Sequence, residues 1–214
     1  MIQRVGLFFL AAVLLGSAPA AAQSVSFGGT VGPNFSTVTT SDDLSTGIRT
    51  TVMFGGVMRL EVPGPVDLQT ELLFLEKGTS VTEGTGQVNY NASYLEVPLQ
   101  LRFQLPSIWR LDFFGMGGGS FGLKIFETQS VGGTLETQVG TDTSFYERTD
   151  ISALAGLGAT FDDGPSPISL VIRYMHGFND VARSVDEQPF QNSGNVFPNT
   201  ASLRTVTLAF YFGI

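Results

Sequence analysis

Side chains along most of this chain alternate between apolar and polar with a period of two, and that pattern predicts β-strands. In the segment 94–103, Leu95, Val97 and Leu99 have odd numbers and so share one face of the strand, and Glu96 and Gln100 have even numbers and share the other. We call this assignment of a residue to a face its parity. The pattern predicts eight strands, at 24–35, 48–60, 66–77, 94–103, 110–124, 150–161, 168–176 and 201–214. Strands of about 10–15 residues exceed those of most soluble sheets and suffice to cross a bilayer at a tilt.

Charged residues fall mainly on one face of these strands. From the second strand to the eighth, twelve of fourteen charged residues lie opposite the apolar stripe: Arg49, Arg59, Glu61, Asp67, Glu71, Lys77, Glu96, Arg102, Arg110, Asp112, Lys124 and Arg173. Only Glu76 and Arg204 share the apolar parity, and both are expected where lipid gives way to water. A soluble barrel with an apolar core and a membrane barrel with a polar interior both fit this segregation.

The predicted connections alternate between short and long. The short ones are 61–65, 104–109 and 162–167, and the long ones are 36–47, 78–93, 125–149 and 177–200. In an up-and-down sheet this rhythm gives one tight end and one elaborated end, as in barrels with short periplasmic turns and long external loops. Pro98 cannot donate a ladder hydrogen bond, so we expect a bulge at that residue.

Composition excludes several classes of site. The 11 Lys and Arg against 19 Asp and Glu give a net charge of −8, and no basic cluster offers nucleic acid a footprint. Cysteine is absent, and His176 is the only histidine, so thiolate metal sites and histidine-based catalysis are not expected. We therefore expect a protein that is not an enzyme, with no catalytic, metal or cofactor site.

Residues 1–22 have the pattern of an export signal. Arg4 precedes an apolar stretch from Val5 to Leu15, and Ala20–Ala22 form a small-residue cleavage site. Residues 23–214 would then form the mature domain. No stretch of that domain is long and apolar enough for a spanning helix, so membrane insertion would have to use strands.

Four segments resemble a known family: 28–36 (GGTVGPNFS), 68–78 (LQTELLFLEKG), 94–103 (YLEVPLQLRF) and 173–180 (RYMHGFND). They are similar to the outer-membrane β-barrel proteins common in Bacteroidetes-type bacteria, often called porin-family or PorT-like. The resemblance implies an all-β, eight-stranded antiparallel up-and-down transmembrane β-barrel in the outer membrane. It also implies outer-membrane lipid and the barrel-assembly machinery as partners, and no catalytic residues. One departure is the end of the chain, Phe212-Gly213-Ile214, where such barrels often end in Phe or Trp.

The candidate site is the barrel interior. Eight strands enclose a space that side chains can just fill, so inward charges should pair and plug it. The predicted lumen charge network is Arg59, Glu71, Glu96, Arg102, Arg110, Asp112 and Arg173. The expected function is structural, or binding of an extracellular ligand by the long loops. The alternatives are a narrow pore for small solutes and a soluble, lipocalin-like binding barrel.

Overall fold

The computed structural model describes residues 24–39, 46–83, 86–131, 137–139, 146–161, 167–180 and 202–213. The predicted export signal at 1–22 lies outside these residues, as do most of 177–200 and part of 125–149. In the described segments, no helix is long and apolar enough to cross a membrane.

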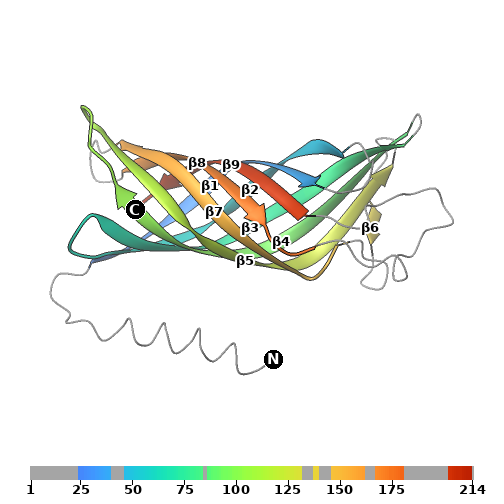
Figure 1. Ribbon diagram of the computed structural model, residues 1–214, viewed down its shortest axis with the longest axis horizontal. Helices are drawn as coiled ribbons and strands as arrows, with labels where there is room; N and C mark the ends of the chain where they lie inside the picture. Colours follow the sequence, from blue (N-terminus) through green and yellow to red (C-terminus); the bar gives the residue numbers. More distant parts are fainter. Residues whose placement is uncertain are drawn as a thin grey trace, which may run out of the picture.

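Long antiparallel strands close into a barrel, which confirms the predicted fold class (Figure 1). Each strand pairs with the next along the chain, except at the short β6, and β9 returns to pair with β1. The strands are β1 (Ser24–Thr39), β2 (Thr46–Glu61), β3 (Val66–Glu83), β4 (Gly86–Gln104), β5 (Leu111–Val131), β6 (Thr137–Val139), β7 (Thr149–Phe161), β8 (Ile168–Gly177) and β9 (Ser202–Phe212). β6 pairs only with the last part of β5, so eight long strands form the wall.

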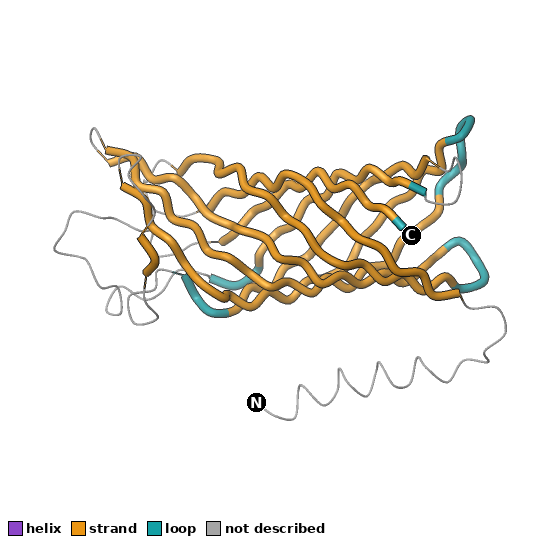
Figure 2. The backbone as a smooth tube through the Cα atoms, turned by 180° about the vertical axis from the view of Figure 1, so that it is seen from behind, coloured by secondary structure: helices purple, strands orange, loops and turns teal. Residues whose placement is uncertain are grey.

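The two ends of the barrel differ. The short connections 62–65 and 105–110 share one end with the last residues of β9, and we call this the tight end (Figure 2). At the opposite, elaborated end, β3, β4 and β5 continue well past the predicted limits. The prediction of a loop at 78–93 is wrong, because β3 runs to Glu83 and β4 begins at Gly86. Serine, threonine and asparagine interrupt the apolar alternation there, so the sequence pattern fades while the ladder continues.

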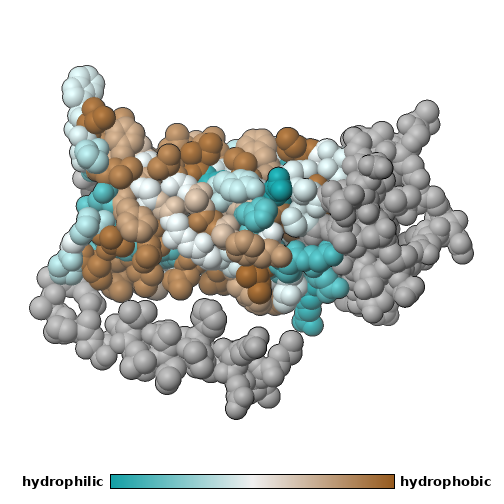
Figure 3. All heavy atoms as spheres, in the orientation of Figure 1, coloured by the Kyte–Doolittle hydropathy of each residue, from teal (hydrophilic) through white to brown (hydrophobic). Residues whose placement is uncertain are grey.

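The apolar face of the strands points outward. In β8, residues alternate between exposed and buried, with Ile172 and Tyr174 exposed and Arg173 fully buried. In β4, Leu99 is 51% exposed while its neighbour Gln100 is 1% exposed. Apolar residues accordingly cover much of the visible barrel wall (Figure 3). This is the arrangement of a membrane barrel, because a soluble barrel turns its apolar face inward.

Register irregularities do not fall where they are expected. Pro98 pairs with Ser120 in a regular β4–β5 register, so the bulge predicted at that residue is wrong. The β4–β5 register shifts instead between Ser93, which pairs with Phe126, and Tyr94, which pairs with Lys124. The extra residue on β5 changes the alternation, and both Lys124 and Glu127 reach the interior as a result.

Candidate functional site: the charged barrel interior

Glu71 on β3 is the centre of the innermost polar layer. Arg173 Nη1 on β8 donates to Glu71 Oε2 at 3.0 Å, and both side chains have no exposed surface. The Tyr211 hydroxyl on β9 donates to Glu71 Oε1 at 2.9 Å. The side-chain amides of Gln69 and Gln100 donate to the same oxygen. Groups from four strands therefore neutralise and solvate one buried carboxylate.

Apolar side chains surround this ion pair. Arg173 Nη2 lies 3.7 Å from the sulfur of Met53, which belongs to a buried apolar cluster. The members of that cluster are Met53, Val57, Leu73, Leu75, Phe114, Met116, Val171, Ala209 and Tyr211. Charges taken out of water in this way depend on each other, since the desolvation of each is offset only by its partner.

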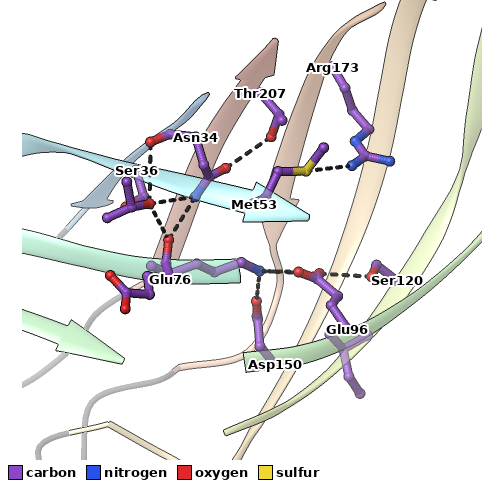
Figure 4. Close-up of polar contacts among 12 residues, drawn as sticks. Asn34, Ser36, Met53, Glu76, Glu96, Ser120, Asp150, Arg173 and Thr207 are labelled. Atoms are coloured by element: carbon purple, nitrogen blue, oxygen red, sulfur yellow. Dashed lines mark hydrogen bonds and ion pairs between the residues drawn. The ribbon is translucent and has the colours of Figure 1, made fainter. Parts of the chain in front are cut away.

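Lys77 on β3 forms a second buried cluster, nearer the elaborated end. Its Nζ lies 2.7 Å from Asp150 Oδ2 on β7 and 3.1 Å from Glu96 Oε2 on β4. The Ser120 hydroxyl donates to Glu96 Oε1 at 2.8 Å, and the Lys77 ammonium lies 5.5 Å from the centre of the Tyr94 ring. Figure 4 shows the Glu96 and Asp150 carboxylates converging from different strands.

Neutral side chains complete the interior beside β1, where the β2–β3 register shifts between Ile48 and Met53. Asn34 Nδ2 donates to the Glu76 carbonyl at 2.7 Å, and the Thr207 hydroxyl donates to Asn34 Oδ1 at 3.0 Å (Figure 4). The Thr51 hydroxyl donates to the same carbonyl at 2.8 Å. These contacts satisfy a β3 backbone group at the irregularity, where a buried unpaired carbonyl would be costly.

Lys124 and Glu127 form a further pair toward the elaborated end. Lys124 Nζ lies 2.9 Å from Glu127 Oε2 and also donates to the Tyr146 carbonyl. The Glu127 side chain is 3% exposed, so this pair extends the charged interior past the Lys77 cluster.

A polar cavity opens at the tight end. Its volume is about 330 Å³, and Asp67 and Asp112 are among its lining residues. Two of its other lining residues form an ion pair, in which Arg59 Nη2 lies 2.6 Å from Glu61 Oε1. The Arg102 guanidinium lies 3.6 Å from the centre of the Phe114 ring and donates to the Thr160 hydroxyl at 3.0 Å; both of these residues also line the cavity.

The seven residues predicted as a lumen network lie at different levels of the barrel. The structure brings Glu71 and Arg173 together, and it places Glu96 in the Lys77 cluster. Arg59 and Arg102 lie at the cavity of the tight end.

Arg110 and Asp112 stand apart from the buried pairs. Asp112 is exposed at the rim of the tight-end cavity. Arg110 is exposed in the 105–110 turn, with its guanidinium carbon 5.6 Å from the centre of the Phe161 ring.

Among the described residues, the predicted set omits several charged residues of the interior, including Asp67, Lys77, Lys124, Glu127 and Asp150. Lys77 has the inward parity but stood at a predicted strand end, and Asp150 stood at the edge of another. Glu127 fell in a predicted loop, and only the β5 bulge turns it inward. Parity could have added Lys77 to the set, whereas Glu127 required the bulge to be known.

The comparisons with known proteins agree with a membrane barrel. Residues 21–183 match the model of the family described as "Outer membrane protein beta-barrel domain". The search of the curated proteins gives no match.

Two of the solved structures that are similar to this chain show the range of the match. One is Ail, the attachment invasion locus protein of Yersinia pestis, with 13% identity and a TM-score of 0.42, covering 87% of this chain and 97% of that one. A second is the Neisserial surface protein A, with 9% identity and a TM-score of 0.46, covering 89% of this chain and 99% of that one. On the family match, the chain belongs to the outer membrane protein β-barrel domain family and is an outer-membrane β-barrel protein.

Proposed function

We propose that this protein is a closed outer-membrane barrel with a structural role or a role in binding an extracellular ligand through its long connections. The observation that carries the proposal is the pair of buried ionic clusters across the interior. The side chains of Arg173 and Glu71 have no exposed surface. The Lys77 side chain is 1% exposed, and the Glu96 side chain is fully buried. A hydrated ion could pass only by separating these partners in a low-dielectric interior, which costs several kcal/mol for each charge.

The space inside the wall supports the same proposal. Eight-stranded barrels leave room for little more than side chains. Large residues fill this one, and its fully buried side chains include Arg173, Tyr90, Tyr94, Tyr146, Tyr211, Lys77 and Phe114. The tight-end cavity stops below the Arg173 layer, because its lining includes neither Glu71 nor Arg173. A narrow pore would need these side chains to move.

Ligand binding is assigned to the elaborated end. β3, β4 and β5 project there, and β6 adds a short strand to β5. Loops on a rigid barrel are free to vary without disturbing the wall, which suits them to recognition. A soluble lipocalin-like barrel is disfavoured, because its apolar residues would have to face inward.

We further propose how the protein reaches the outer membrane. The pattern at 1–22 supports a cleaved export signal, and outer-membrane lipid and the barrel-assembly machinery follow as partners. The segments 68–78 and 94–103 support the PorT-like type within the broader family.

Planar-bilayer recording tests the closed lumen. The purified, refolded protein should give little or no steady conductance, because ion pairs and large side chains block the path. The double variant Lys77→Ala with Arg173→Ala removes one cation from each cluster and should conduct more, provided that heat-modifiable mobility shows it folded. A stable ohmic channel in the unmodified protein would favour the pore instead.

Protease accessibility tests the orientation. Protease added to intact cells should cleave within 125–149 or 177–200, which we place outside the cell. The connection 162–167 at the tight end should stay intact until the outer membrane is permeabilised. The reverse pattern would overturn the orientation and, with it, external binding by the long connections.

A further inference from the structure

Arg204 is an exposed cation on the lipid-facing side of β9. The alternation of β9 turns Leu203 and Thr205 inward and Arg204 outward. Within the described part of the chain, no ion pair or hydrogen bond engages its side chain. Sequence parity assigns one strand carboxylate, Glu76, to this face. It lies on β3, and β1 and β2 separate β3 from β9. Among the described residues, Arg204 therefore has no ion-pair partner on its own side of the barrel.

His176 on β8 is the register partner of Arg204. Its Nδ1 lies 3.3 Å from the Tyr174 hydroxyl, and its ring centre lies 5.7 Å from that of Phe178 in an edge-on arrangement. Tyr174 and Phe178 are 43% and 67% exposed. These contacts orient the imidazole on β8, at the register position next to Arg204.

The surface changes character at this point. Toward the tight end, the same face of β8 and β9 carries exposed Ile172, Val206 and Phe210. Toward the elaborated end the strands stop, since β8 ends at Gly177 and β9 begins at Ser202. Arg204 and His176 thus lie where an apolar belt ends, flanked by aromatic rings of the kind that mark a membrane–water interface.

We propose that Arg204 and His176 form a binding site for the phosphate of a membrane lipid headgroup. The guanidinium supplies the charge and paired N–H donors that match phosphate geometry, and the imidazole supplies a second polar contact. Acyl chains of the bound lipid lie along the apolar belt below. The proposed site requires only that the protein lies in the outer membrane. The proposed orientation determines which leaflet supplies the lipid.

The single histidine makes the site directly observable. Protein without a histidine tag, labelled with ¹³C at histidine and refolded in uncharged maltoside micelles, gives one imidazole Cε1–Hε1 NMR signal. Titration with bisphosphorylated lipid A or with phosphatidylglycerol should shift that signal saturably. Lipid A stripped of its phosphates should leave it in place, because the site recognises phosphate.

Variants identify the cation. Arg204→Gln should raise the midpoint of the titration about tenfold or more, as expected for loss of a charge-assisted hydrogen bond. Arg204→Lys keeps the charge without the paired donors and should have a smaller effect. Arg148→Gln is the matched control, because it removes an exposed cation just before β7 at the same end. Heat-modifiable mobility checks the folding of each variant.

The outcomes separate the site from the orientation. A saturable shift with either phosphate-bearing lipid supports the site, and the protease experiment in intact cells decides which leaflet provides the lipid. An equal shift with phosphate-free lipid A, or an unchanged midpoint in Arg204→Gln, would overturn the proposal and leave Arg204 as a hydrated rim cation.

Discussion

Replacing Glu71 by Ala should lower the free energy of unfolding by about 3–5 kcal/mol, the usual cost of breaking a buried ion pair. Arg173 would keep its charge in an apolar surrounding without its ion-pair partner. The hydroxyl of Tyr211 and the amides of Gln69 and Gln100 would lose their acceptor at the same time. Urea titration of the protein in lipid vesicles, followed by heat-modifiable mobility, measures the change.

Two comparisons show whether the loss comes from an unpaired buried charge. Glu61→Gln breaks the Arg59–Glu61 pair, whose Glu61 side chain is 43% exposed, and should cost less than about 1 kcal/mol. The double variant Glu71→Leu with Arg173→Met removes both charges and should recover the part of the loss that comes from the unpaired Arg173 charge, while the donors of Tyr211, Gln69 and Gln100 still lack their acceptor. Similar losses for Glu71→Ala and Glu61→Gln would mean that the interior pair is no better buried than the rim pair, and the closed lumen would lose its support.

Strand parity predicted the face of each side chain but not its partner. Glu71 and Arg173 are 102 residues apart, and their strands β3 and β8 are not neighbours in the sheet. Their contact crosses the lumen, so it depends on the register of every strand between them. Alternation contains no such information, because it repeats every two residues whatever the height in the barrel.

Irregular backbone explains the other differences. The bulge that turns Glu127 inward has no signature in the alternation, and the polar ladder between Gly78 and Asn91 looks like a loop in sequence. The pattern is informative where lipid contacts one face of a strand and side chains fill the other. Beyond the membrane, water contacts the strands, and the contrast between faces is lost.

Replacing Leu99 by Arg should destabilise the assembled barrel by about 2–4 kcal/mol, the cost of an arginine facing lipid near mid-depth. Leu99 is 51% exposed on the outer face of β4, five residues from the strand's tight end at Gln104. At about 3.3 Å per residue and a tilt of about 40°, that places it roughly 13 Å from the tight end, near the middle of an apolar band about 25 Å tall. The free energy of unfolding in vesicles and the fraction of protein assembled in cells measure the effect.

The depth dependence of this effect distinguishes lipid contact from ordinary packing. Thr39→Arg adds the same charge to the exposed last residue of β1 at the elaborated end, and it should cost no more than about 1 kcal/mol. Leu208→Arg, on the outer face of β9, should resemble Leu99→Arg. A spin label at position 99 should in turn be quenched by oxygen in the lipid and protected from water-soluble nickel complexes. If the nickel complex quenches the label in the assembled protein, this face contacts water and not lipid. The expected cost of Leu99→Arg would then have no basis. The polar interior would also lose its explanation as the face turned away from lipid.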